Sequence, residues 1–146
     1  DVIPPRGVPG LSYELADSLE DLLQRSDIVT VHVPYTKDTH HLLNEERLKM
    51  MKRGSYLVNT SRGDIIEGPA LLSLLKSGHL AGAGLDVFHL EPPVDEWEKS
   101  LVSLPNGVTV TTCHIGAQTL QAQRRESVEL AERIIEESSK LGKRTA

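Results

Sequence analysis

Four short runs of apolar and β-branched residues recur along this chain of 146 residues, and segments with a helical pattern separate them. The runs span residues 28–33 (IVTVHV), 55–61 (SYLVNTS), 81–88 (AGAGLDVF) and 108–112 (VTVTT). Strands that alternate with helices through short connections are typical of βα units. Such units build a mostly parallel sheet, because each helix returns the chain to the end of the sheet from which the next strand starts. The sequence therefore predicts an α/β fold with a doubly wound parallel sheet.

Each of the first three helical segments carries a signal for its first turn. Ser18 with Asp21 three residues later is a plausible capping box, and Pro69 suits a first helical position. Asn44 is a favourable N-cap residue. These signals predict three helices, over residues 18–26, 44–53 and 69–79.

The second half of the chain contains one long connection and one long helix. Residues 91–107 (EPPVDEWEKSLVSLPNG) predict a loop with one helical turn around Trp97. From residue 118 the apolar residues return at helical spacing, which predicts a helix to about 141. We therefore expect a partial sheet domain over 1–117, the helix over 118–141 and a frayed tail over 142–146.

The composition narrows the class of function. A net charge of −5 argues against a nucleic-acid or anionic-membrane partner. No apolar run approaches the roughly 20 residues that cross a bilayer, and no signal-peptide pattern opens the chain. The single cysteine, Cys113, excludes an internal disulfide and fits a reducing, cytoplasmic compartment.

Three polar residues follow three of the predicted strands: Arg62 in VNTSRG, Glu91 in GLDVFHLEPP and His114 in TTCHIGAQT. In an open α/β sheet these strand ends meet at one edge, where ligands bind. Arginine can grip a carboxylate through two parallel hydrogen bonds. Imidazole titrates near neutrality, so His114 can give a proton to a developing alkoxide while a carboxylate partner orients its ring. The three residues predict a crevice that binds a carboxylate substrate and moves a proton.

Other site chemistries have less support. His40, His41, Asp38 and Cys113 suggest a metal site, but adjacent histidines lack ordinary ligand spacing, so we expect no bound metal. Cys113 beside His114 suggests a nucleophilic pair, but neighbours in a strand point to opposite faces. Since the pattern G-x-S-x-G of a serine nucleophile is absent from the sequence, we expect the proton to pass to a substrate oxygen.

The blocks VNTSRGDII, AGAGLDVFHLEPP and CHIGAQT resemble the signature segments of the D-isomer-specific 2-hydroxyacid dehydrogenases, and HVPYTKDTHHLLN resembles the segment before them. Their order and spacing agree along nearly the whole chain. That family includes phosphoglycerate, glyoxylate/hydroxypyruvate and D-lactate dehydrogenases. The resemblance implies that residues 1–117 are part of a Rossmann-type NAD-binding domain, and that 118–141 is its long crossover helix. It also implies an NAD-dependent oxidoreductase that reversibly reduces a small-molecule 2-keto acid to a D-2-hydroxy acid. The family suggests that the full-length protein forms a homodimer.

The resemblance assigns roles to individual residues. Arg62 would bind the carboxylate and carbonyl oxygen of the substrate, His114 would be the acid/base, and Glu91 its partner. Asp86 would hydrogen-bond the nicotinamide carboxamide, and Asp1 would hold the ribose hydroxyls, which favours NAD over NADP. The other expected cofactor contacts are Val33, Pro34, Thr60, Ser61, Arg62, His114, Ile115, Gly116 and Ala117.

The chain also departs from the family pattern. The first strand and the glycine loop G-x-G-x-x-G are missing, and residues 82–84 are not that loop, because Val87 occupies the place of the third glycine. Cys113 stands where proline is usual, and His89 where an acidic residue is common. Since Asp1 is not a methionine, we expect the chain to begin inside a larger protein. Because the glycine loop is missing and the cofactor site is incomplete, we expect the chain to be inactive alone.

Two alternatives to an enzyme stay open. The family resemblance includes transcriptional corepressors that keep the fold and bind NADH without turnover, and the same three residues can persist in them. The other alternative is an inactive truncated product, because missing first strands would leave the sheet with an open edge. Formate dehydrogenases of the superfamily carry glutamine at the position of Glu91, so the glutamate argues against formate. The sequence does not single out one 2-hydroxy acid.

Overall fold

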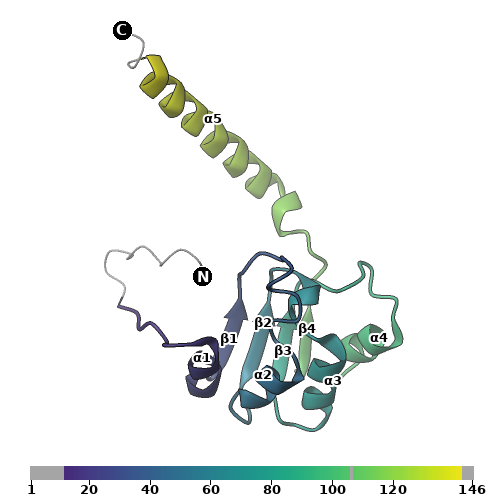
Figure 1. Cartoon of the computed structure of the whole chain (residues 1–146). Helices are drawn as coiled ribbons and strands as arrows, with labels where there is room; N and C mark the ends of the chain where they lie inside the picture. The colour runs from purple at the N-terminus through teal and green to yellow at the C-terminus, as the bar shows by residue number, and fades with distance from the viewer. Residues whose placement is uncertain (1–11, 106, 143–146) are drawn as a thin grey trace. The chain divides into compact units, whose positions relative to one another are not determined.

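The computed structural model describes residues 12–105 and 107–142, and the chain divides into two compact units, Asp1–Cys113 and His114–Ala146. The first unit contains a parallel sheet of β1 (Ile28–Val31), β2 (Tyr56–Asn59), β3 (Gly82–Leu85) and β4 (Thr109–Thr111), in the order β1-β2-β3-β4 (Figure 1). Each strand is shorter than the apolar run that predicted it. The predicted parallel α/β fold is confirmed.

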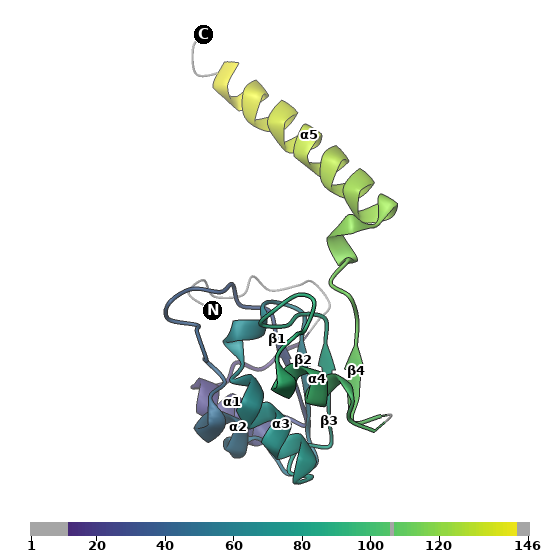
Figure 2. The same cartoon turned by 90° about the vertical axis from the view of Figure 1, so that its right-hand side faces the viewer.

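Helices connect the strands and cover one face of this sheet (Figure 2). After α1 (Leu19–Arg25), the connections contain α2 (Glu45–Met50), α3 (Gly68–Lys76) and α4 (Glu96–Val102), with a 3₁₀ turn η1 (Gly63–Ile65) before α3. Each helix packs against the next one along the chain. This arrangement follows from right-handed crossovers, because every connection steps to the neighbouring strand in the same direction.

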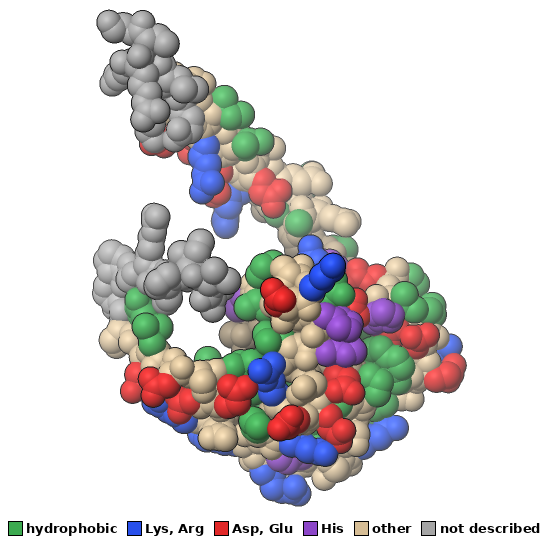
Figure 3. Space-filling view, in the orientation of Figure 1, with side chains coloured by type: hydrophobic (Ala, Val, Ile, Leu, Met, Phe, Trp, Pro, Cys, Tyr) green, Lys and Arg blue, Asp and Glu red, His purple; other side chains and the backbone are tan. Residues whose placement is uncertain are grey.

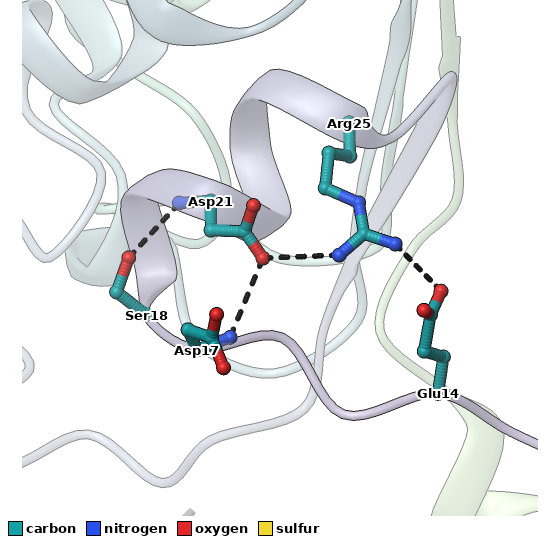
Figure 4. A network of polar contacts seen from close by, with 5 residues as sticks. All are labelled: Glu14, Asp17, Ser18, Asp21 and Arg25. Atoms are coloured by element: carbon teal, nitrogen blue, oxygen red, sulfur yellow. Dashed lines mark hydrogen bonds and ion pairs between the residues drawn. The ribbon is translucent and has the colours of Figure 1, made fainter.

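The helix starts follow the sequence signals. The Ser18 hydroxyl accepts a hydrogen bond from the backbone N–H of Asp21 at 3.0 Å, and Asn44 caps α2 in the same way. Arg25 joins the first turn of α1 to its last, through Asp21 at 3.2 Å, and also reaches Glu14 at 2.6 Å (Figure 4). The capped helices predicted around Ser18 and Asn44 are confirmed.

Segment 91–107 differs from its prediction. Instead of a loop with one turn, it contains α4, seven residues from Glu96 to Val102. Leu101 is buried in the core, and the ring of Trp97 lies against Gly68 at the start of α3, where a Cβ would fall 2.1 Å from the ring. The helix forms because its apolar residues, four positions apart, pack onto α3.

The core lies between the sheet and its helices. Alternate strand residues point into it, and Val29, Val31 and Leu57 are buried. Helix side chains meet them from the other side, with Leu23, Leu48, Leu71, Leu74 and Leu101 all buried. The alternation of buried and exposed positions is strict in β1, as expected for a strand with one face packed on helices.

The second unit contains a 3₁₀ turn η2 (Gly116–Gln118) and the long helix α5 (Leu120–Gly142). The predicted long C-terminal helix is confirmed. The tail predicted over 142–146 lies outside the described residues, apart from Gly142. Within the described ranges, no helix combines the length and the apolar character needed to cross a bilayer.

Candidate active site

The structure places the predicted site residues of the first unit along the carboxyl edge of the sheet. Val33 and Pro34 follow β1, the segment 60–62 follows β2, and Asp86 follows β3 directly. Since the four strands are parallel, all these positions lie at the same edge. Asp1 lies outside the described residues, so its expected contact with the ribose stays a prediction.

Hydrogen bonds join the strand ends to one another along this edge. The Ser61 hydroxyl donates to the backbone oxygen of Val33, which ties the turn after β2 to the segment after β1. The backbone N–H of Asp86 donates to the oxygen of Asn59 at 3.0 Å, and the Thr112 hydroxyl donates to the Asp86 carboxylate. The carboxyl edge is therefore held as a connected row from β1 to β4.

Asn59, which the sequence reasoning overlooked, shapes the turn that carries Arg62. Its side chain is only 1% exposed. The amide Nδ2 donates to the backbone oxygen of Arg62 at 2.9 Å, and Oδ1 accepts from the N–H of Ser61 at 3.0 Å. An asparagine at a strand end followed by a turn is the signal that could have found it, because its side chain bonds the backbone two residues on. Arg62 itself is exposed, and its Nη1 donates to the oxygen of Ser61 at 2.6 Å.

The loop that carries Glu91 is held by several bonds. The Glu91 carboxylate accepts from the backbone N–H of Phe88 at 3.3 Å. Leu90 donates its N–H to Oε1 of Glu98 at 3.1 Å, and Glu98 is a fully buried residue of α4. Because the sequence predicted a loop here, Glu98 was not recognised as a buried group.

The turn of Arg62 and the loop of Glu91 are in close backbone contact. A Cβ on Gly63 would lie 2.2 Å from the carbonyl carbon of Phe88 and 2.4 Å from the backbone nitrogen of His89. Only glycine allows this approach. His89 also hydrogen-bonds the Asp64 carboxylate through Nδ1. The structure thus brings together the segments that carry two of the three predicted catalytic residues.

That contact changes the protonation of His89. The hydrogen bond to Asp64 raises the pKa of the imidazole above its ordinary value, against a smaller lowering by burial. The negative charges of Glu98 and Asp95 also raise it. The cationic imidazole is therefore favoured, because its partners are acidic.

His114 belongs to the second unit, with Ile115, Gly116 and Ala117, so its convergence with Arg62 and Glu91 stays a prediction. Its backbone is unusual: φ is +52°, in the left-handed region that non-glycine residues rarely adopt. Such strain collects at functional sites, where surrounding structure maintains it. The positive φ of His114, which the sequence did not predict, supports the special role proposed for this residue.

The described residues match one end of a dinucleotide. Asp86 offers carboxylate oxygens, which suit the N–H donors of a carboxamide, and the hydroxyls of Thr60 and Ser61 lie at the same edge. Among residues 12–105 and 107–142, no group of three or more His, Cys, Asp or Glu side chains is arranged to hold a metal ion.

A parallel sheet with ligand-type polar groups along its carboxyl edge defines a nucleotide-binding α/β domain. The family profile for the NAD-binding domain of D-isomer-specific 2-hydroxyacid dehydrogenases matches residues 9–116, and the chain belongs to this family. The resemblance stated from the sequence is confirmed, and NAD is the cofactor of the family's domain.

Individual relatives support the same family assignment. The chain is 45% identical over 134 residues to a hydroxypyruvate reductase of Thermotoga maritima, which covers 92% of the chain and 43% of that protein. A glyoxylate reductase of Thermofilum pendens is 47% identical over 127 residues, covering 86% of the chain and 35% of the relative. The crystal structure of an Aquifex aeolicus D-lactate dehydrogenase with NAD and lactic acid matches with a TM-score of 0.70 and 33% identity, over 86% of the chain and 42% of that chain. The chain thus spans less than half the length of these relatives.

Proposed function

We propose that the protein containing this chain is an NAD-dependent oxidoreductase that acts reversibly on the CH–OH group of a D-2-hydroxy acid. The observation that carries this proposal is the backbone contact at Gly63, which places the Arg62 turn against the Glu91 loop. Family membership supports it, and so does the row of hydrogen bonds along the carboxyl edge.

Arg62 is proposed to hold the substrate's carboxylate and carbonyl oxygen. A guanidinium has five N–H donors, and the bond from Nη1 to the Ser61 oxygen uses one of them, which leaves donors for a substrate. The buried side chain of Asn59 fixes the turn that carries Arg62 through two hydrogen bonds to its backbone. A buried anchor of this kind limits the motion of the turn, so the guanidinium is preorganised for bidentate contact.

His114 is proposed to give a proton to the substrate's C2 oxygen during reduction and to take it back during oxidation. Glu91 is proposed to orient the imidazole and to stabilise its cationic form. The bond from the Phe88 N–H holds the Glu91 carboxylate against its own loop. General acid–base assistance of this kind contributes about 10²- to 10⁴-fold to the rate.

The bound cofactor would supply a hydride to C2 as NADH or accept one from C2 as NAD⁺. We propose that Asp86 contacts the carboxamide of the cofactor and that Asp1 contacts its ribose. The other proposed cofactor contacts are Val33, Pro34, Thr60, Ser61, Ile115, Gly116 and Ala117. The hydrogen bond from the Thr112 hydroxyl fixes the Asp86 carboxylate, which supports this proposed contact.

The substrate is proposed to be a small 2-keto acid or the matching D-2-hydroxy acid. The names of the relatives contain hydroxypyruvate and glyoxylate on the oxidised side and phosphoglycerate and lactate on the reduced side. A homodimer, a cytoplasmic location and a partial cofactor domain over 1–117 belong to the same proposal. The single cysteine, compatible with a reducing compartment, supports the location.

The test is a kinetic panel on the protein that contains this chain. NADH and NADPH are each combined with glyoxylate, hydroxypyruvate, 3-phosphohydroxypyruvate and pyruvate, and absorbance at the reduced nicotinamide band is followed. Arg62→Gln should lower kcat/KM by roughly 10- to 100-fold, because charged hydrogen bonds contribute about 1.5–3 kcal/mol each. Arg53→Gln, at an exposed arginine before β2, is the matched control and should behave as wild type. No turnover with any of the acids would contradict the proposal.

A further inference from the structure

We propose that His89 and Asp64 form a positioning pair that holds the Arg62 turn and the Glu91 loop in register for catalysis. This inference rests on the proposed function, because it assigns a role to residues that support the same site. Neither residue is proposed to touch the substrate or the cofactor.

The first support is the position of the pair across two elements. Asp64 lies in η1, two residues after Arg62, and His89 lies two residues before Glu91. Their side chains hydrogen-bond through Nδ1 and Oδ1, although 25 positions separate them in the sequence. The bond therefore spans the interface at which the Gly63 backbone meets that of Phe88.

The second support is that the surroundings fix both partners. The backbone oxygen of Asp64 accepts from the N–H of His41 at 2.8 Å, which anchors η1 on its other side. The next residue after His89, Leu90, donates to the fully buried Glu98 at 3.1 Å. The second oxygen of Glu98 is buried and has no hydrogen-bond partner among residues 12–105 and 107–142. A buried carboxylate kept in this state is costly, so the loop position that it fixes is under constraint.

The third support is the charge around the imidazole. Asp64, Asp95 and Glu98 face it from η1 and α4, and His40 and His41 line the same surface pocket from the segment before α2. Figure 3 shows histidine side chains gathered beside acidic ones on this side of the first unit. The acidic neighbours raise the pKa of His89, the hydrogen bond to Asp64 most of all. When the imidazole is protonated, His89 binds Asp64 as an ion pair.

Rising pH weakens the ionic link between His89 and Asp64. Because the folded-state pKa of His89 is raised, the ionic link is complete below the unfolded pKa of about 6.5 and is lost as pH rises through the higher folded value. A loosened link should let the Arg62 turn and the Glu91 loop move apart. Misplacement by about 1 Å can cost about 10²-fold in rate.

The test uses the whole protein that contains this chain and two readouts. Long-range ¹H–¹⁵N spectra follow the imidazole of His89, assigned by its disappearance in His89→Gln. We expect a pKa above 6.5 that falls in Asp64→Asn. Asp27→Asn is the matched control, since Asp27 forms an exposed ion pair with Lys52 at 2.8 Å between two other turns. It should leave the His89 titration unchanged.

The second readout is kcat/KM for the best 2-keto acid against pH. His89→Ala should lower it about tenfold or more near neutral pH, mostly through kcat, in proportion to the misplacement of the turns. His89→Asn puts an amide donor near the position of Nδ1, which bonds Asp64, but cannot titrate, so it should recover most of the activity and remove one ionisation from the profile. Asp27→Asn should match wild type in both respects.

The outcomes separate the two proposals. Wild-type turnover that is unchanged in His89→Ala, or a His89 pKa that does not respond to Asp64→Asn, would overturn the positioning pair alone. Absence of turnover in the wild type would overturn the proposed function and the positioning role with it, even where the His89–Asp64 link is found by its titration.

Discussion

The two ends of the same sheet are built differently. At the amino end, Gly54, Gly78 and Gly107 precede β2, β3 and β4 with φ of +83°, +67° and +93°, and a Cβ on any of them would meet nothing within 4 Å. At the carboxyl end, turns are packed backbone against backbone at Gly63 and joined by side-chain hydrogen bonds such as that of Ser61. Glycine serves chain reversal at one end and close approach at the other.

The two ends of the sheet also differ in the buried polar groups and the turn conformations that they contain. The amino-end turns need a left-handed residue, which glycine supplies without strain, and among the described residues the buried Ser55 hydroxyl there has no hydrogen-bond partner. The carboxyl end contains a buried asparagine, Asn59, whose amide is hydrogen-bonded at both its nitrogen and its oxygen, and a buried glutamate, Glu98, with one oxygen unpaired within the part of the chain that the structure describes. Proteins keep such costly groups mainly where function requires a fixed geometry. The close backbone contact at Gly63 supports the proposal that the carboxyl edge is the functional end, and substitutions at the two ends should then have different consequences.

The largest effect is expected at His114, which follows β4. His114→Asn removes the proton donor but suits a positive φ, because asparagine tolerates the left-handed region. We expect kcat to fall by about 10²- to 10⁴-fold, with little change in thermal stability or in NADH affinity. Steady-state kinetics with thermal unfolding measure both. Retained turnover would remove His114 from its acid/base role.

Gly63→Ala should damage both structure and activity. Its Cβ would fall 2.2 Å from the backbone of Phe88, and backbone cannot give way as a flexible side chain can. The two turns must separate, so the free energy of unfolding should drop by about 1–3 kcal/mol, and kcat/KM by up to about 10²-fold. Chemical denaturation and kinetics are the measurements. A variant with full activity would show that the contact is not needed for catalysis.

Asn59→Ala tests whether the buried Asn59 side chain holds the turn that carries Arg62. It leaves the Arg62 oxygen and the Ser61 N–H without their bonds to the buried amide. Loss of a buried partner costs about 1–3 kcal/mol. The KM for the 2-keto acid should rise more than kcat falls, because the Arg62 guanidinium loses its fixed position. An unchanged KM would mean that Asn59 supports only the fold.

The smallest effect is expected at the amino end. Gly54→Ala places a side chain at φ of +83°, which costs about 1–2 kcal/mol of stability although space is available. Neither kcat nor KM should change, since the turn lies at the opposite end of the sheet. A loss of activity beyond that caused by unfolding would break the distinction between the two ends.

The strands and the strand-end residues could be predicted from the sequence, because β-branched runs and the polar residues after them are local signals. The runs at 28–33 and 108–112 are examples of such strands. The first-turn signals at Ser18 and Asn44 are local in the same sense. The turn of Arg62 was located, but its anchor Asn59 was not, since its burial depends on the neighbouring strands.

The rest depended on tertiary contacts. α4 was predicted as a loop because Pro92 and Pro93 and the short apolar pattern gave a weak helical signal, and only packing of Trp97 on Gly68 and burial of Leu101 reveal it. The link between Asp64 and His89 joins residues 25 positions apart. No local pattern encodes such a contact, because it exists only once β2 and β3 have paired.

The most direct test of the central claim is an NADH titration of the protein that contains this chain, followed by ¹H–¹⁵N spectra after ¹⁵N-glycine labelling. Single glycine-to-alanine variants assign the signals. If the carboxyl edge is the cofactor site of a 2-hydroxyacid dehydrogenase, the Gly63 signal should shift saturably, while those of Gly54, Gly78 and Gly107 stay in place. Saturable shifts at the amino-end glycines with none at Gly63 would contradict the account.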